Sequence, residues 1–433
     1  MRRDNRIFMN YVISKKGKEI FAFFFALSFI LNSYSSGIDG ISLGAVIHII
    51  YAIVSIVLIS KYGLKIGKNA VQISPILLAI IFTVISMIDI VFLPSSETSL
   101  LNIFKELGKV YLWGFSICIV NYIFFDVKHL KKWFVRIGVV STIFLFVQFL
   151  VWTISGIAIN GIVDFVFLKP YDMSYITNTG AFYATLYRPS SFFSEPAFYS
   201  NFIFAAMILV LVNSDEIKEQ KIHYIATIIF FSAGILISAS TAGVILLFFL
   251  FCLYYKNYIL KNLFSFFIGV GFLLVLSCSV WLASDYFTKD TFIGKYVVAI
   301  DQKIDVMDHS RRFGRSYDAL DYLNDKQKIF GVGFGNEVNV LPPNSDLYMN
   351  TVTMMIFSVG GIGLLLFVIF IMRFLINSRN YIVLFLIVTY IVKCVNGAIG
   401  FSLYGILFLG LTIFLNFYWS HANKNYNINY SRY

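Results

Sequence analysis

A short polar segment in the middle of the chain holds residues that could bind an anion and move a proton. It reads Arg188-Pro-Ser-Ser-Phe-Phe-Ser-Glu195-Pro-Ala. An arginine can hold a phosphate group through two parallel hydrogen bonds, and a carboxylate can orient or deprotonate a substrate hydroxyl. Ser190 and Ser194 add hydroxyl groups. These four residues are candidate site residues, and we call residues 188–195 the arginine–glutamate segment.

A local structural role would explain some of the same residues. Ser194 or Glu195 suits the position just before a helix, and Pro196 suits its first turn. Arg188 could contact lipid headgroups instead of a substrate. Helix capping and substrate binding are compatible, so both interpretations stay open.

A second polar segment carries three arginines within five positions, which we call the arginine cluster: Arg311, Arg312 and Arg315. Such a group of bidentate donors suits a diphosphate. A basic patch that rests on anionic lipid would have the same composition. The nearby His309 is a candidate catalytic base, although a lone histidine is more often a polar surface residue.

Four apolar residues after the arginine cluster recur at roughly helical spacing and predict a short amphipathic helix: Phe313, Tyr317, Leu320 and Leu323. Asp318 and Asp321 would lie on its more hydrated side.

A glycine-rich run, Gly331-Val-Gly333-Phe-Gly335, follows this helix and precedes a polar turn that contains Asn344. The run lacks the Lys-Ser/Thr pair of a phosphate-binding loop. Close packing of loop backbone is the use that its glycines favour. We keep Gly331, Gly333 and Asn344 as candidate substrate-binding residues. No group of His, Cys, Asp and Glu has the spacing of a metal site, so we expect no metal.

The composition determines the kind of elements that must position these residues. Of the 433 residues, 59% are hydrophobic and only 13% are charged, against about 25% charged in a soluble protein. The composition therefore predicts an all-α, polytopic integral membrane protein. The cysteines all fall inside apolar runs, which argues against a disulfide framework.

About twelve apolar runs are long enough to cross a bilayer. They lie near residues 19–35, 41–60, 71–93, 109–125, 134–157, 197–213, 223–239, 241–259, 263–283, 350–372, 380–397 and 401–419. Residues 238–240, which we call the serine turn, separate two of them.

Basic residues predict the orientation, because they concentrate in the cytoplasmic connections of membrane proteins. Those expected inside include Lys61, Lys65, Lys68, Lys128, Lys131, Lys132, Arg136, Lys256, Lys261, Arg373 and Arg379. Both termini of the single membrane domain, residues 1–433, are then cytoplasmic. Two long loops, 158–196 and 284–349, lie outside. The short inner loops carry no nucleotide-binding motif, so chemistry is expected on the outer face, where nucleotide sugars and ATP are absent.

These residues resemble motifs of the bacterial O-antigen and capsular polysaccharide polymerases (Wzy type), in the superfamily that includes the O-antigen ligases. The resemblance rests on the arginine–glutamate segment, on Ser238-Ala-Ser240-Thr241 between two spans, and on Arg312 followed by Ala319-Leu320 and the glycine run. Met349-Asn350 before Gly360-Gly-Ile-Gly363 is similar to the ligase pattern His-Asn before a glycine-rich span. Met349 in place of histidine, and Ser240-Thr241 in place of Ser-Arg, favour a polymerase.

The resemblance implies a GT-C-like membrane glycosyltransferase in the bacterial inner membrane. Its substrate would be oligosaccharide linked to undecaprenyl diphosphate, with no cofactor and no nucleic acid. Glu195 would act on the acceptor hydroxyl, with Arg312 and His309 as further catalytic candidates. Arg188, Arg311, Arg315, Ser240 and Thr241 would bind substrate. A chain-length regulator and a flippase would be candidate partners.

An O-antigen ligase and a lipid-linked oligosaccharide flippase are the competing interpretations. Transporters are often built from repeated halves, and the two halves of this chain do not match in the position of their long loop. Charges inside the predicted spans are few, mainly Asp89 and Lys393, so no charged translocation path is evident.

Overall fold

The computed structural model describes residues 13–38, 41–62, 70–92, 100–120, 124, 126–163, 187–212, 221–254, 317–336, 340–341, 349–378, 380–397 and 400–430. Within these ranges the regular elements are helices, and no β-strand occurs. The predicted all-α class is therefore confirmed for the described part of the chain.

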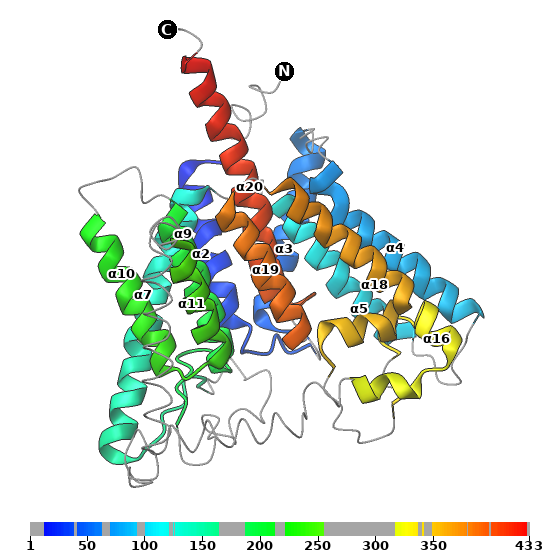
Figure 1. Ribbon diagram of the computed structural model, residues 1–433, viewed down its shortest axis with the longest axis horizontal. Helices are drawn as coiled ribbons and strands as arrows, with labels where there is room; N and C mark the ends of the chain where they lie inside the picture. Colours follow the sequence, from blue (N-terminus) through cyan, green and yellow to red (C-terminus); the bar gives the residue numbers. More distant parts are fainter. Residues whose placement is uncertain are drawn as a thin grey trace, which may run out of the picture. The chain divides into compact units, whose positions relative to one another are not determined.

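The chain divides into two compact units. Unit 1 holds α2 (Lys15–Leu31), α3 (Leu43–Tyr62), α4 (Ala70–Phe92), α5 (Leu100–Phe115), the π-helical turn η1 (Ser116–Val120), the 3-10 turn η5 (Ala319–Tyr322), α16 (Asp325–Phe330), α18 (Thr351–Asn377), α19 (Tyr381–Asn396) and α20 (Leu403–Tyr430). Unit 2 holds most of α7 (Val127–Ser155) together with α9 (Pro196–Val212), α10 (Lys221–Ile237) and α11 (Thr241–Tyr254) (Figure 1).

Three of these helices, α3, α7 and α18, are long and apolar enough to cross a membrane. A described helix overlies each predicted span except 263–283, which lies outside the described residues. The predicted span 109–125 overlies α5 and η1, and α5 begins earlier, at Leu100. Lys109 and Glu106 pair at 2.6 Å, one turn apart on this helix.

The glycine turn (residues 331–336) packs against a break in α18. Gly360 has φ 65°, which interrupts the helix. The carbonyl groups of Phe357 and Ser358 accept hydrogen bonds from the backbone N–H groups of Val332 and Gly333, at 2.7 and 3.0 Å. Because a buried carbonyl without a partner is costly, these bonds stabilise the break and the turn together.

Glycine is needed on both sides of this contact. A Cβ atom at Gly331, where φ is 92°, would lie 2.6 Å from the Ser358 carbonyl, and one at Gly360 would collide with the Ile329 carbonyl. Side chains rarely adopt such positive φ angles. The close backbone packing expected of the glycine run is therefore confirmed.

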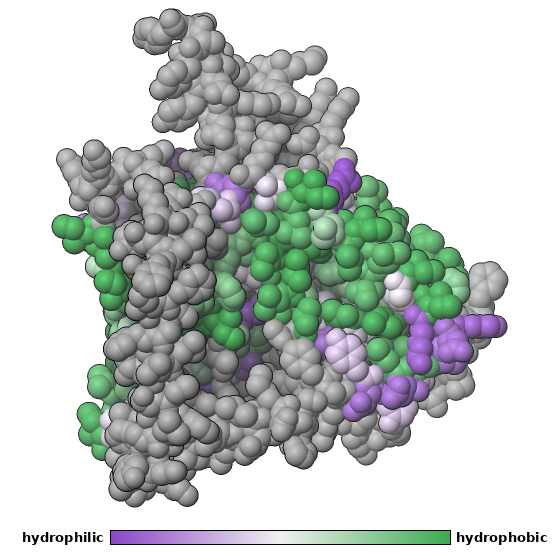
Figure 2. All heavy atoms as spheres, in the orientation of Figure 1, coloured by the Kyte–Doolittle hydropathy of each residue, from purple (hydrophilic) through white to green (hydrophobic). Residues whose placement is uncertain are grey.

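The described part of the helix predicted from Phe313 to Leu323 is a short helical stretch that ends in η5, and α16 follows it as a separate helix; Phe313 lies outside the described residues. A cluster of Ala319, Leu323, Val332 and Phe357 anchors them to α18. Asp318 and Asp321 are exposed, as expected, whereas Tyr317 is also exposed and does not join the apolar side. Figure 2 shows hydrophilic residues over α16 beside the hydrophobic surface of α18 and α4.

In unit 2, α9 is the buried element, because every residue from 199 to 210 is enclosed. It contacts α10 and α11, and its Phe202 stacks on Phe134 of α7 at 4.9 Å between ring centroids. Small residues permit the close approach: a Cβ atom at Gly243 of α11 would lie 2.6 Å from the Ser200 Oγ.

We expect Gly331→Ala and Gly360→Ala each to lower the thermal stability of the detergent-solubilised protein. The left-handed backbone alone costs a side chain about 1–2 kcal/mol, and the clash with backbone atoms adds to this. Gly108→Ala is the matched control, because a Cβ atom there meets nothing within 4 Å. An unfolding temperature unchanged in both test variants would contradict the packing role of these glycines.

Candidate functional site

The arginine–glutamate segment leads directly into α9. The Glu195 carbonyl accepts hydrogen bonds from the N–H groups of Phe198 and Tyr199, at 3.1 and 3.2 Å. Glu195 thus occupies the position before the helix, and Pro196 is its first residue, as the local interpretation predicts. The start of α9 therefore fixes the backbone of Glu195.

Gln148 of α7 holds the centre of the segment. Its Oε1 accepts a hydrogen bond from the Ser191 N–H at 2.8 Å, and its Nε2 donates to the Ile159 carbonyl at 2.9 Å. The Ser191 hydroxyl donates to the Ser141 carbonyl at 2.7 Å. Ser191 has φ 56°, an unfavourable conformation for a residue with a side chain. These bonds to α7 hold it there.

Aromatic contacts attach both ends of the segment to the same helix. Phe192 stacks on Phe144 with 4.5 Å between ring centroids, and Tyr187 lies 5.7 Å from Trp152. The Tyr187 hydroxyl donates to the Ile159 carbonyl at 2.8 Å. Burial raises the pKa of Tyr187 to about 12, so this hydroxyl remains a donor at any ordinary pH.

The segment is recessed beside α7 and does not extend past its end. The hydroxyls of Thr142 on α7 and Tyr199 on α9 are 2.9 Å apart, which sets the two helices in register. At 1.5 Å per residue along the helix axis, the start of α9 at Pro196 lies within about 6 Å of Tyr199. The end of α7 at Ser155 lies about 20 Å beyond Thr142. A Cβ atom at Gly161 would collide with the Ser191 carbonyl, so the chain after α7 also encloses the segment.

The serine turn meets the start of α9. The hydroxyls of Ser238 and Ser200 are 3.3 Å apart, and the Ser200 hydroxyl donates to the Pro196 carbonyl at 2.9 Å. Ser240 is buried, and its Oγ accepts a hydrogen bond from the Gly243 N–H at 3.3 Å, which caps α11. Thr241 is the first residue of that helix.

Two motifs that are distant in the sequence therefore lie together in unit 2. Arg188, Ser190, Ser194 and Glu195 are all half-buried, and the Nε atom of Arg188 is fully enclosed. A cation, two hydroxyls and a carboxylate in a recess could bind a phosphate and handle the proton of a hydroxyl. Ser240 contributes to this region as a helix cap, a structural role.

Gly331 and Gly333 belong to unit 1 and pack on α18. His309, Arg311, Arg312, Arg315 and Asn344 lie outside the described residues.

Gln148, Ser141 and Ser191 were not singled out from the sequence as positioning residues. The signal for Gln148 was its place in the apolar run 134–157, since an uncharged polar residue inside a span commonly bonds to neighbouring backbone. Its partners could not be identified, because they lie 11 and 43 positions away along the chain.

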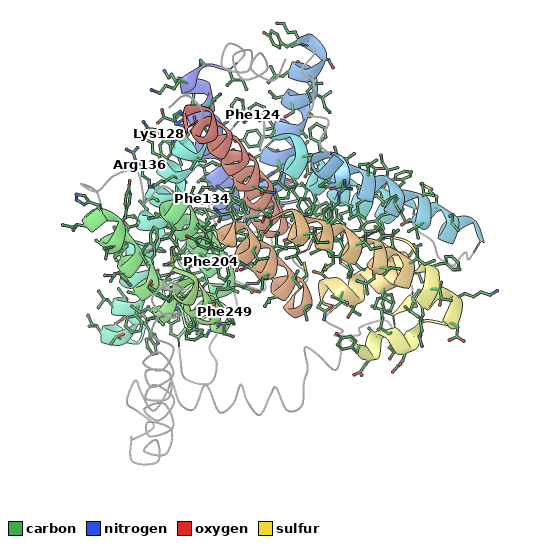
Figure 3. The ribbon with its side chains drawn as sticks, turned by 45° about the horizontal axis from the view of Figure 1, so that its top comes forward. Phe124, Lys128, Phe134, Arg136, Phe204 and Phe249 are labelled. Carbon is green, nitrogen blue, oxygen red and sulfur yellow. The ribbon has the colours of Figure 1, made fainter. Side chains whose placement is uncertain are left out.

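The opposite end of α7 is basic and aromatic. Figure 3 labels Lys128 and Arg136 in this part of the helix, and the Nζ of Lys131 lies 4.0 Å from the centre of the Tyr224 ring. Lysine, arginine and aromatic residues of this kind gather at membrane interfaces. The basic residues and the recess therefore occupy different halves of α7.

No protein-family model and no curated protein sequence matches this chain.

We expect Gln148→Leu to release the arginine–glutamate segment from α7. The Ser191 N–H would lose its partner in a buried place, at a cost of about 1–3 kcal/mol. Hydrogen–deuterium exchange of residues 187–195 should accelerate, while exchange in α10 stays unchanged. Thr153→Val is the control, because that exposed hydroxyl bonds only within α7. Equal protection in both variants would show that Gln148 does not position the segment.

Proposed function

We propose that this protein is a Wzy-type polysaccharide polymerase, which joins undecaprenyl-diphosphate-linked oligosaccharide units at the outer face of the bacterial cytoplasmic membrane. In this proposal the chain crosses the membrane about twelve times, has both termini in the cytoplasm, and makes O-antigen or capsular polysaccharide. The three helices long enough to span a bilayer support the membrane location.

The charge distribution along α7 supports the orientation. Basic residues at its beginning suit the cytoplasmic side, and Arg136 with Trp133, 5.4 Å from the ring centre, fits an interfacial position. The arginine–glutamate segment packs on the second half of the helix, which then lies in the outer half of the bilayer. Non-helical backbone at that depth is tolerated where protein encloses it, as Gln148 and Gly161 do here.

The enclosed position of the arginine–glutamate segment beside α7 is the observation on which this function rests most. Arg188 and Glu195 would lie in the outer half of the bilayer, on the side where the diphosphate of a lipid carrier lies between its buried chain and its hydrated sugars. A sugar donor that is linked to a lipid diphosphate already carries its leaving group, the lipid diphosphate. The reaction therefore needs no nucleotide on the outer face.

In the proposed reaction, an acceptor hydroxyl oxygen attacks the anomeric carbon of the donor sugar. The bond from this carbon to the diphosphate oxygen breaks, and its electron pair leaves with undecaprenyl diphosphate. The Glu195 carboxylate takes the hydroxyl proton. Arg188 stabilises the charge that develops on the diphosphate, Arg312 is a further candidate for this role, and the configuration at the anomeric carbon inverts.

A gene-deletion strain distinguishes this function from its two alternatives. Loss of a polymerase leaves single repeat units on the surface, visible by gel electrophoresis of surface polysaccharide. Loss of a flippase leaves no surface sugar, and loss of a ligase leaves long chains on the carrier lipid. Either of the last two patterns would refute the polymerase.

Arg188→Ala, Arg312→Ala and Glu195→Gln should each abolish long chains while the protein still inserts. Removal of one group that stabilises developing charge typically slows a reaction about 100-fold or more. Lys326→Ala is the matched control, because it removes an exposed cation from α16. Chain-length ladders and immunoblots of membranes provide the measurement, and normal chains in both arginine variants would refute the diphosphate role.

A further inference from the structure

Lys393 is the one buried residue among the described Lys, Arg, Asp and Glu side chains, with 7% of its surface exposed. It lies in the last turn of α19, which otherwise consists mainly of apolar residues. An ionisable residue in such a helix normally pairs with another group or faces a binding site.

No carboxylate from the surrounding helices is available to Lys393. It makes no hydrogen bond or ion pair in the part of the chain that the structure describes. α19 packs on α18 and α20, and the sequences of all three helices contain no Asp or Glu. Thr389, one turn before Lys393, is 1% exposed, and its Oγ1 also lacks a hydrogen-bond partner.

The other polar groups near Lys393 are already engaged. The Tyr390 hydroxyl donates to the Gly400 carbonyl at 2.9 Å. The Gly397 carbonyl accepts from both the N–H and the hydroxyl of Thr351, at 3.0 and 2.7 Å. Lys393, which no described residue pairs, and Thr389, whose Oγ1 is buried without a partner, thus lie one helical turn apart in a largely apolar helix. Leaving a buried charge without a partner is strongly destabilising.

Lys393 lies at the end of unit 1 where α18 begins. The bonds between Thr351 and Gly397 join the first turn of α18 to the end of α19. At the same end, Phe401 contacts Phe334 of the glycine turn, at 6.1 Å between ring centroids.

We propose that Lys393 binds the phosphate group of a lipid anion, namely the diphosphate of the lipid-linked substrate. The assignment rests on the proposed function and gives a cation of a membrane helix in unit 1 a role in binding that substrate. The anion supplies the negative charge that α18, α19 and α20 lack. The Thr389 hydroxyl, one turn before Lys393, is a second donor on the same side of α19.

The test uses the full-length protein in phosphatidylcholine nanodiscs and measures binding of undecaprenyl diphosphate and, separately, of phosphatidylglycerol. The variants are Lys393→Met, Lys393→Gln and Lys393→Arg, with Lys61→Met as a control at an exposed lysine of α3. We expect the two neutral variants to bind undecaprenyl diphosphate at least about tenfold more weakly, as for loss of a charged hydrogen bond. Lys393→Arg and Lys61→Met should bind like the unmodified protein.

A structural role for Lys393 makes a different prediction for stability. Replacement of an unpaired buried charge by an apolar side chain should leave the ligand-free protein as stable or more stable, so Lys393→Met should keep its unfolding temperature. A clear decrease of that temperature in both neutral variants would assign Lys393 to folding and overturn the site.

The outcomes separate this inference from the proposed function. Equal binding of undecaprenyl diphosphate by the unmodified protein and both neutral variants overturns the role of Lys393 and leaves the polymerase standing. Loss of phosphatidylglycerol binding alone identifies an ordinary membrane phospholipid as the anion and overturns the substrate assignment. Absence of any undecaprenyl diphosphate binding by the unmodified protein overturns both.

Discussion

Every backbone N–H and C=O group that is withdrawn from water must find a partner inside the protein, and two of the described non-helical segments are organised by that constraint. Gln148 supplies partners to the arginine–glutamate segment in unit 2. In unit 1, the broken α18 offers the carbonyls of Phe357 and Ser358 to the glycine turn. These hydrogen bonds allow both segments to lie against apolar helices with the bonded backbone groups paired.

The two solutions require different residues. Where a side chain provides the hydrogen bonds, as Gln148 does, the loop can keep its own side chains, and the arginine–glutamate segment carries both Arg188 and Glu195. Where two backbone segments contact each other directly, neither has room for a side chain at the contact. Gly331 and Gly360 occupy these positions for that reason. The glycine turn is thus suited to joining elements, and the arginine–glutamate segment to presenting functional groups.

Patterns within one element could be interpreted from the sequence, whereas contacts between distant elements could not. Hydropathy predicted the helices, and the preferences of proline and glutamate predicted the start of α9 at Pro196. α5 extends beyond the predicted span and begins at Leu100, and the ion pair between Lys109 and Glu106 accommodates charged residues in this helix. Tyr317 was assigned to an apolar face by spacing alone, and the packing of Ala319 and Leu323 on α18 determines that face instead. The contact between the serine turn and the start of α9 needed the tertiary structure, since no local rule joins Ser200 to Ser238.

The burial of α9 has a consequence for how the protein is made. Residues 199–210 are enclosed by protein, yet the chain is synthesised from its N-terminus, so α9 leaves the ribosome before α10 and α11 exist. The packed core of unit 2 can therefore form only after α10 and α11 have been made, and until then the apolar surface of α9 lacks its final neighbours. The polar residues Ser200 and Asn201 lie near the beginning of α9, and the helix after them carries only apolar side chains during that interval.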